Sequence, residues 1–285
     1  MLDAAALVEG RFTTSFNCAA FAFSHGLHRE PLYDLPSLLA LAKRLGPASA
    51  YWSTRPVTIG DGWEDQRARE WSLEEAVEGV ENADTLIVLK DIELDPVYGP
   101  VFRRVVEDMA AVVGPMLQND ALHGRATLLV SSPRRITGYH IDAEANFLMQ
   151  LRGEKTVHVF DGSDRTLVSR QDLERFYAGD LNAAPYWPDR QGEALTLGFK
   201  PGDGVHVPIG WPHWVQNGDN VSVSISINYD LRSNLRQSRV FRFNHRLRRL
   251  GFNPTDPGQS PLRDGGKAAL FAGIEGVRQL RRKAG

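Results

Sequence analysis

The chain has 285 residues, of which 42% are hydrophobic and 24% are charged, and its formal net charge is −2. This composition excludes collagen, coiled-coil and wholly disordered proteins, and the length suits one large domain or two modest ones. No apolar run reaches the roughly 18–20 residues of a membrane span, and the N-terminus, with an acid at Asp3, does not resemble a secretory signal. Because Cys18 is the only cysteine, an internal disulfide and a thiolate metal cluster are excluded, and we expect a soluble, cytoplasmic protein.

Residues 1–125 are predicted to form mixed α/β elements. The run PSLLALAKRL at 36–45 is typical of a short amphipathic helix, with a proline near its start and a glycine just after its end. The run SLEE opens a second helix over 72–81 as a capping box, in which the serine and the second glutamate bond to each other's backbone amides. The β-branched run 85–89 predicts a buried strand, and 100–113 predicts a third helix.

Residues 126–230 change in character, because short β-rich runs such as TLLVSS, NFLMQL, KTVHVF and GVHVPI now follow one another between glycine turns. This spacing favours a β-sandwich or barrel over a parallel sheet. The residues RGE at 152–154 predict a hairpin turn, since the glycine can adopt the left-handed conformation. A polar insertion, 162–198, is predicted to contain a helix near 169–178.

Residues 231–285 are predicted to be a basic helical segment, with helices over 233–250 and 266–283. From residue 232 onwards there are thirteen Lys or Arg residues and three acids, a charge of +10, which leaves −12 on the rest of the chain. Such a segment either attracts nucleic acid or another acidic partner, or is a solvated helical face whose arginines pair with the acidic body. The helices of 233–283 either form a homodimer or cap the barrel. The apolar stripe that suits both roles comprises Leu235, Val240, Phe243, Leu247 and Leu250.

Two histidines and one aspartate carry the chemistry of the β-rich region. His140 and Asp142 lie two residues apart, so on a strand their side chains share a face, as adjacent metal ligands require. His213 joins them only if the strands curl into a barrel. Two imidazoles and one carboxylate form the facial triad of non-haem Fe(II) sites, although an isolated His-x-Asp is usually a structural pair. Zinc, nickel or cobalt could occupy the same ligands.

The segments around these residues resemble the jumonji-C family of the cupin superfamily, the Fe(II)- and 2-oxoglutarate-dependent oxygenases. The runs that carry the resemblance are HIDAEANFLMQLRGEK, PGDGVHVPIGWPHWVQN and VSVSISINY. They are most similar to the branch that contains the asparaginyl hydroxylase of hypoxia-inducible factor, strongly over 126–230 and only in organisation over 50–113. The resemblance implies a mainly β fold, a double-stranded β-helix (the cupin or jelly-roll barrel), with N-terminal α/β elements packed on it and helices after it.

The resemblance also assigns residues to the iron and to its co-substrate. It implies that His140, Asp142 and His213 bind Fe(II) and form the catalytic centre. It further implies that Thr137 and Lys155 hold the distal carboxylate of 2-oxoglutarate, which agrees with the need of a buried dicarboxylate for a cation. Without the surrounding motif, Lys155 would be read as a strand-edge lysine that discourages aggregation. The matching asparagines near the iron-chelating end of the co-substrate are Asn146 and Asn228.

The serine face of the last strand, Ser222 to Asn228, either lines the co-substrate cavity or is half exposed. His206 and His158 are interpreted as structural or pocket-lining residues. Trp211 is predicted to pack near the metal, and Tyr139 and Arg135 to border the substrate entrance. The candidate substrate pocket therefore comprises Tyr139, Arg135, His206 and Trp211. The N-terminal tyrosine that contacts the co-substrate in some members of the family cannot be assigned from the sequence.

The resemblance implies that 2-oxoglutarate and O2 are converted to succinate and CO2 while a C–H bond of an acceptor, in the nearest branch a protein side chain, is hydroxylated. Related members hydroxylate RNA bases or demethylate lysines, and a small metabolite is a further open choice. The alternative from another class is a cupin-type metal-binding protein that regulates or senses a ligand without turnover. The pairing of Thr137 with Lys155 favours the enzyme, because a metal-only cupin needs no cation and hydroxyl for a distal carboxylate.

Overall fold

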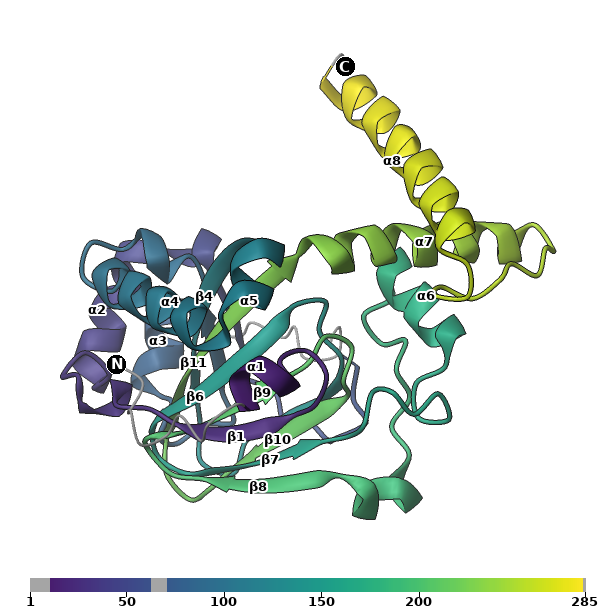
Figure 1. Ribbon diagram of the computed structural model, residues 1–285. Coiled ribbons are helices and arrows are strands. Elements are labelled where there is room, and N and C mark those ends of the chain that lie inside the picture. The colour runs from purple at the N-terminus through teal and green to yellow at the C-terminus, as the bar shows by residue number, and fades with distance from the viewer. Residues whose placement is uncertain (1–10, 63–70, 284–285) are drawn as a thin grey trace.

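The computed structural model describes residues 11–62 and 71–283, with the side chains of the last helix described as far as residue 276. Residues 1–10, on which the expectation about a secretory signal rests, lie outside this part. Two antiparallel sheets form the body (Figure 1), with strand orders β1-β9-β6-β11-β4-β3-β2 and β5-β10-β7-β8. The strands of the larger sheet are β1 (Phe21–Ser24), β2 (Ala50–Ser53), β3 (Leu86–Leu89), β4 (Ala121–Ser131), β6 (Ala145–Arg152), β9 (Asp203–Val207) and β11 (Ser222–Leu231). Those of the smaller sheet are β5 (Ile136–His140), β7 (Lys155–Val159), β8 (Leu195–Phe199) and β10 (His213–Asn217).

The α-helices are α1 (Arg11–Ser15), α2 (Leu35–Leu45), α3 (Leu73–Glu78), α4 (Gly99–Val113), α5 (Pro115–Asp120), α6 (Arg170–Ala178), α7 (Arg232–Arg249) and α8 (Pro261–Lys283). Helix α1 precedes the first strand, α2 to α5 lie between strands β1 to β4, α6 lies between β7 and β8, and α7 and α8 follow the last strand. The 3₁₀ helices are η2 (Leu27–Arg29), η3 (Pro47–Ser49), η4 (Ile92–Leu94) and η5 (Pro188–Glu193). In Figure 1, α7 runs on from β11, and α8 projects away from the sheets. Among the helices of the described residues, none is long and apolar enough to cross a membrane.

Local sequence signals account for where several helices begin. The predicted capping box is present at α3, where the Ser72 amide donates to Glu75 Oε2 at 2.7 Å and the Glu75 amide to Ser72 Oγ at 3.2 Å. An equivalent box formed by Ser169 and Asp172 opens α6. These side chains satisfy amide groups that have no partner inside the first turn of a helix.

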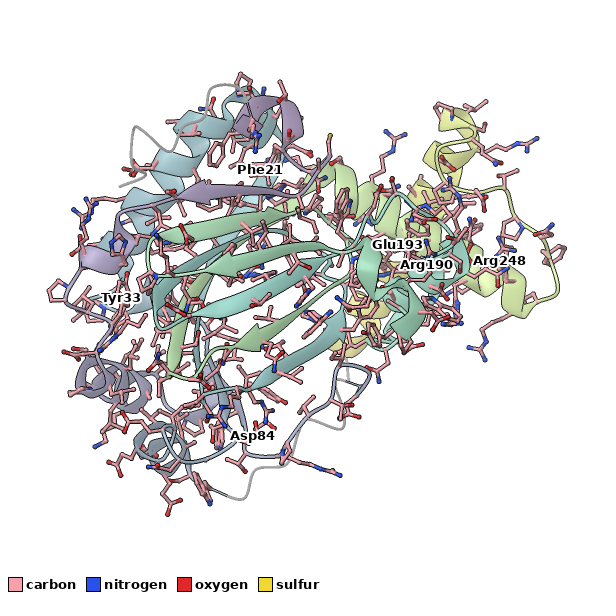
Figure 2. All side chains as sticks on the ribbon, turned by 90° about the horizontal axis from the view of Figure 1, so that it is seen from below. Phe21, Tyr33, Asp84, Arg190, Glu193 and Arg248 are labelled. Atoms are coloured by element: carbon pink, nitrogen blue, oxygen red, sulfur yellow. The ribbon has the colours of Figure 1, made fainter. Side chains whose placement is uncertain are left out.

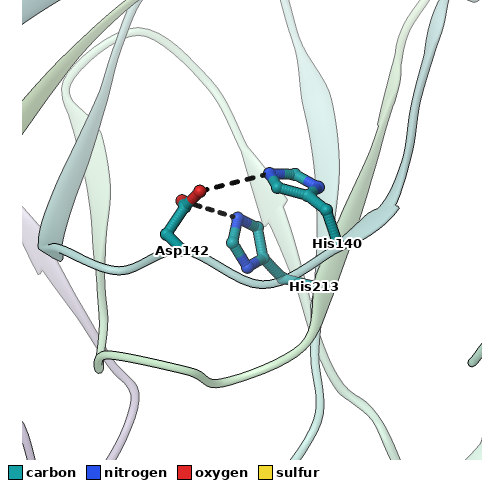
Figure 3. A group of neighbouring side chains, drawn as sticks. All are labelled: His140, Asp142 and His213. Atoms are coloured by element: carbon teal, nitrogen blue, oxygen red, sulfur yellow. Dashed lines mark ion pairs between the residues drawn. The ribbon is translucent and has the colours of Figure 1, made fainter. Parts of the chain in front are cut away.

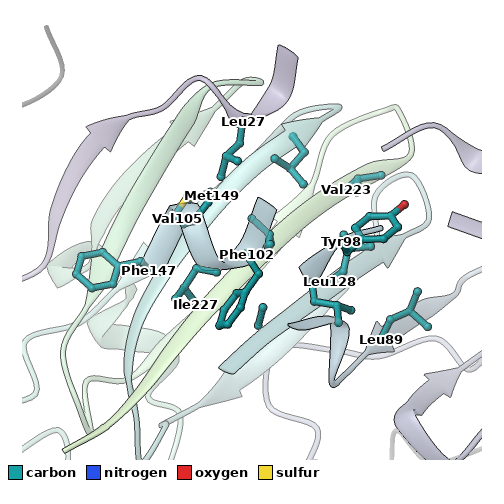
Figure 4. Packing of buried hydrophobic residues seen from close by; sticks show 14 of the residues in the cluster. Leu27, Leu89, Tyr98, Phe102, Val105, Leu128, Phe147, Met149, Val223 and Ile227 are labelled. Carbon is teal, nitrogen blue, oxygen red and sulfur yellow. The ribbon is translucent and has the colours of Figure 1, made fainter. Parts of the chain in front are cut away.

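The main hydrophobic core lies between the larger sheet and helices α1 to α5 (Figure 4). Along β11, Val223, Ile225 and Ile227 face this core, while Ser226 and Asn228 face the space between the sheets. This alternation follows from the two-residue period of a strand. The larger sheet therefore has an apolar outer face, which the helices cover, and a partly polar inner face, which the smaller sheet faces.

Strands that precede residue 126 belong to the same sheet as the barrel strands. β3 pairs with β4 from Leu86↔Ser131 to Leu89↔Leu128, and β1 pairs with β9. Residues before 126 thus extend the larger sheet by three strands, in addition to supplying the helices on its outer face. The expected mainly β jelly-roll architecture with flanking helices is confirmed.

The insertion between β7 and β8 is held by a small charged network. Arg190 Nη2 lies 2.8 Å from Asp164 Oδ2 and 2.6 Å from Glu193 Oε2. Figure 2 places Arg190 and Glu193 side by side, with Arg248 of α7 at the same end of the molecule. The expected helix of this insertion is present as α6, and Arg248 Nε lies 2.8 Å from its Glu174.

Candidate metal centre and co-substrate cavity

The structure brings His140, Asp142 and His213 together. One ligand atom from each lies within 4.8 Å of the others. His140 Nε2 is 3.9 Å from one Asp142 carboxylate oxygen, and His213 Nε2 is 3.6 Å from the other (Figure 3). His213 begins β10 opposite His140 at the end of β5, so antiparallel pairing joins residues that are far apart in the sequence.

Asp142 is not on a strand, which corrects the expectation that one strand carries both early ligands. β5 ends at His140, and residues 141–144 form an irregular connection to β6. The side-chain alternation continues past the end of the strand, because His140, Asp142 and Glu144 all line the same cavity. The two ligands do share a face, as inferred. However, Asp142 is not held there by the hydrogen bonds of a strand pair, because β5 ends before it.

Hydrogen bonds fix the tautomers of both histidines. His140 Nδ1 lies 2.7 Å from the Gly138 carbonyl oxygen, and His213 Nδ1 lies 3.0 Å from that of Trp211. A carbonyl oxygen can only accept, so each Nδ1 carries the hydrogen and each Nε2 keeps its lone pair. Both Nε2 atoms face the Asp142 carboxylate, so the donor set fits a divalent metal ion.

Burial keeps the His213 imidazole neutral. Desolvation, and then the neighbouring His140, lower the pKa of His213 to about 4. A histidine must be uncharged to bind a metal through Nε2. At neutral pH His213 is therefore already in the protonation state that a ligand needs.

The three ligands line a cavity of about 470 Å³ between the two sheets. All four residues that the resemblance assigns to 2-oxoglutarate line it as well: Thr137, Asn146, Lys155 and Asn228. About half of the remaining lining residues are aliphatic, with Leu86, Val88, Leu129, Leu148, Val207 and Val215 among them, and the others are polar or charged. No tyrosine lies among the lining residues in the described part of the chain.

Lys155 is a buried cation that opens β7. Its side chain is 7% exposed, and burial lowers its pKa to about 7. The glycine of the preceding hairpin, Gly153, has a φ of +68°, as the sequence predicted. A buried ammonium without a counter-charge is costly, so the fold holds Lys155 ready for an anion.

Asn146 and Asn228 face each other across β6 and β11. Asn146 Nδ2 donates to Ser226 Oγ at 2.7 Å and to Asn228 Oδ1 at 2.9 Å. Asn146 Oδ1 is then a buried acceptor with no hydrogen-bond partner in the part of the chain that the structure describes. This amide is oriented by protein groups on one side and available to a ligand on the other.

Only half of the serine face of β11 belongs to the cavity. Ser226 and Asn228 line it, whereas Ser222 and Ser224 are fully buried against Gln150. Gln150 Nε2 donates to Ser222 Oγ at 2.9 Å, and Ser224 Oγ donates to Gln150 Oε1 at 2.6 Å. The Gln150 side chain on β6 occupies the space beside Ser222 and Ser224 that one interpretation of the sequence assigned to the co-substrate cavity.

Arg135 does not border the substrate entrance. It is fully buried, and its Nη1 bonds to the Asp84 carboxylate at 2.6 Å and to the Asp84 and Arg55 carbonyl oxygens. Arg135 therefore ties the start of β5 to the N-terminal strands. Its charge is used within the protein, away from the cavity.

The other three residues of the expected substrate pocket also lie outside the cavity lining. Tyr139 packs against Phe160 and Tyr186, because it points away from its neighbour His140. His206 lies on the outer face of β9 among core aromatic rings, accepts from the Asn17 amide and donates to the Asn146 carbonyl. Burial lowers the pKa of His206 to about 3, which keeps it neutral. Trp211 contributes its backbone carbonyl to His213.

Four charged residues of the cavity were missed by sequence reasoning. They are Lys90, Asp91, Arg125 and Glu144. Glu144 could have been found, because it continues the even-numbered alternation of His140 and Asp142. Arg125 lies opposite Asn228 only through the pairing of β4 with β11, which no local pattern reveals. Arg125 Nη2 bonds to Glu144 at 3.0 Å and to Asp230 at 2.9 Å.

A double-stranded β-helix with a two-histidine, one-carboxylate site is the architecture of a cupin-type metalloprotein. Comparison with protein families agrees: residues 64–234 match the Cupin-like domain family, and the chain belongs to that family. No curated protein matches the sequence at a significant level.

Solved structures give more distant similarities. Escherichia coli ycfD aligns with a TM-score of 0.49 and 14% identity over 98% of this chain and 68% of its own. YcfD, a ribosomal oxygenase from Escherichia coli, in complex with cobalt and succinic acid aligns with a TM-score of 0.49 and 14% identity over 94% of this chain and 66% of its own. An oxalate decarboxylase aligns with a TM-score of 0.27 and 21% identity over 38% of this chain. The chain spans about two thirds of the YcfD chains and 22% of the decarboxylase.

Proposed function

We propose that the protein is an Fe(II)- and 2-oxoglutarate-dependent dioxygenase that hydroxylates a protein side chain. The single observation that carries the proposal is the placement of Lys155, a buried cation, in the same cavity as His140, Asp142 and His213. In the part of the chain that the structure describes, no carboxylate forms an ion pair with its ammonium. A protein that only binds a metal has no use for such a cation, whereas a dicarboxylate co-substrate requires it.

The three metal ligands and the four co-substrate residues then each have a task. His140, Asp142 and His213 would hold the iron. Lys155 and Thr137 bind the distal carboxylate of 2-oxoglutarate, while Asn146 and Asn228 orient its chelating end. When bound, iron supplies the activation of O2 that couples conversion of 2-oxoglutarate to succinate and CO2 with hydroxylation of a C–H bond.

The basic C-terminal segment gives little support to a nucleic-acid acceptor. Four of the seven arginines of α7 interact within the chain: Arg239 and Arg242 with Glu275, Arg248 with Glu174, and Arg246 over the Phe271 ring. Arginines that bind nucleic acid need free guanidinium groups aimed at phosphates. The observation favours the reading in which this segment pairs with acids of the body, and leaves a protein or small-molecule acceptor.

Succinate production tests the proposal. Anaerobically purified protein is given Fe(II) and 2-oxoglutarate and then air, with no acceptor. We expect slow uncoupled succinate formation, lost in His140→Ala and Lys155→Ala. The matched control is Lys200→Ala, which removes an exposed lysine at the end of β8.

If succinate forms equally in Lys155→Ala, the assigned co-substrate site is wrong. If the wild-type protein binds metal but forms no succinate, a titration with 2-oxoglutarate decides between two explanations. Binding that depends on Lys155 means that the acceptor must be present before oxygen reacts. The absence of binding means a cupin-type metal-binding protein without turnover.

A further inference from the structure

The segment that carries Asp142 is supported from behind by helices outside the barrel. Residues 140–144 alternate: His140, Asp142 and Glu144 line the cavity, while Ile141 and Ala143 point the other way. Because β5 ends at His140, no strand pairing holds Asp142 itself. One backbone bond crosses to the other ligand segment, from the Gly210 amide to the Asp142 carbonyl at 2.9 Å.

Ile141 anchors this segment in a second hydrophobic cluster, which we call the rear cluster. It comprises Ile141, Val168, Leu173, Phe176, Tyr177, Ala183 and Phe241. The rings of Tyr177 on α6 and Phe241 on α7 stack with centroids 5.4 Å apart. Ile141 is 3% exposed, so the residue between the two ligands is held by α6 and α7.

A polar contact at the edge of the rear cluster fastens the same segment. Asn234, in the first turn of α7, donates from Nδ2 to the Ala143 carbonyl at 2.7 Å. Its Oδ1 bonds with the Tyr177 hydroxyl at 2.8 Å. The Ala143 carbonyl can only accept, so Nδ2 must face it, and the Tyr177 hydroxyl then donates to Oδ1. Arg242 Nε bonds in turn to the Tyr177 carbonyl at 2.8 Å.

We propose that Asn234 is a positioning residue for the metal centre, and that with Tyr177 it holds the Ala143 carbonyl so that Asp142 faces His140 and His213. This role presupposes the metal centre of the proposed function. It adds that α7, which lies outside the barrel, is part of the machinery that shapes the metal site. Ligands must stay within about 0.5 Å of their productive positions, so a loosened segment weakens binding without removing a ligand.

The test compares two asparagines of the same helix. Asn234→Ala removes the contact with the ligand segment. Asn244→Ala is the matched control, because Asn244 is also in α7 and also donates from Nδ2 to a backbone carbonyl, that of Thr255, at 3.1 Å. We measure the Co²⁺ dissociation constant and visible spectrum, and, in metal-free protein, the hydrogen exchange of the amides of residues 141–144.

We expect Asn234→Ala to raise the Co²⁺ dissociation constant by about tenfold, near the lower end of the effect of groups that orient metal ligands. Its Co²⁺ spectrum should change, and exchange in 141–144 should accelerate at least about threefold as the segment opens locally. Asn244→Ala should alter neither. Equal behaviour of the two variants in all three measurements would overturn the proposal.

A gentler pair keeps the test valid if either alanine variant fails to fold. Tyr177→Phe removes the hydroxyl that orients Asn234, and Tyr229→Phe removes a buried hydroxyl that has no hydrogen-bond partner among the described residues. We expect Co²⁺ binding to weaken about threefold only in Tyr177→Phe, as the loss of one weak hydrogen bond predicts. A wild-type protein that binds no metal would contradict the proposed function, while the exchange rates of 141–144 would still decide the role of Asn234.

Discussion

At the scale of single residues, burial determines the chemistry of Lys155. Its pKa falls to about 7, so the amine loses its proton as the pH rises through 7. A bound dicarboxylate favours the charged form and raises that pKa again. Above pH 7 the binding of 2-oxoglutarate must therefore include uptake of a proton, whereas below pH 7 the amine is already charged.

The affinity for 2-oxoglutarate is expected to be flat below pH 7 and to fall by up to about tenfold per pH unit above it. Calorimetry in buffers of different ionisation enthalpy measures the affinity and the proton uptake together. Lys155→Arg is the control: arginine stays charged, so its affinity, though weaker, should not show this fall. A wild-type affinity that is constant from pH 7 to 9 would exclude Lys155 as the titrating contact.

Single residues also show where reading the sequence failed. Arg135 lies two residues from Thr137, an assigned co-substrate contact, so a place at the entrance was a natural expectation. Its guanidinium instead bonds to Asp84 and to backbone carbonyls that precede β3 and follow β2. Those partners come from more than fifty residues away, and only the folded chain brings them to Arg135.

At the scale of elements, strand periodicity carried most of what could be predicted. The two-residue alternation accounts for the position of Asn146 on the same face as the ligands and for the face of β11 that lies in the core. The same alternation also indicates that His206 and Tyr139 point away from the cavity. His206 adjoins Val207 and Tyr139 adjoins His140, and both of these neighbours line the cavity. The pairing of β4 with β11 and the position of Gln150 depend on side-chain size and non-local contacts, so the extent of the polar cavity was not predictable.

The hairpin between β6 and β7 positions Lys155 through one glycine. Gly153 has a φ of +68°, and a Cβ there would collide with the Val221 carbonyl oxygen. Gly153→Ala should lower the free energy of unfolding by more than about 1 kcal/mol and weaken 2-oxoglutarate binding, because the turn can relax only by moving Lys155. Denaturant unfolding and a binding titration measure the two effects. Gly198→Ala on β8, where a Cβ meets open space, should change neither, and a stable Gly153→Ala with normal binding would contradict this account.

At the scale of the whole molecule, the two C-terminal helices differ in how they relate to the barrel. The sequence left open whether they cap the barrel or form a homodimer. The predicted apolar stripe of α7 is used unevenly: Val240 is buried beside Phe241 of the rear cluster, while Leu235 and Leu250 are exposed. α7 therefore packs against α6 and the ligand segment. α8 projects from the body (Figure 1) and presents Leu262 and Leu270 with 87% and 62% of their surface exposed. If a homodimer forms, α8 offers the two most exposed leucines of the C-terminal helices, Leu262 and Leu270, only one of which exceeds the exposed Leu250 that follows α7.

Substitution on α8 tests dimerisation better than truncation, because removing residues after 229 would also remove Asn234 and disturb the metal centre. We expect the wild-type protein to sediment as a dimer. The double variant Leu262→Glu, Leu270→Glu should sediment as a monomer and keep the Co²⁺ affinity of the wild-type protein. Leu94→Glu, at a leucine of η4 that is 79% exposed, controls for the added charge.

A double variant that stays dimeric would place the interface elsewhere, and a monomeric wild type would leave α8 without this role. Loss of both the dimer and Co²⁺ binding would mean that α7 holds the ligand segment only when a second copy of the chain supports it.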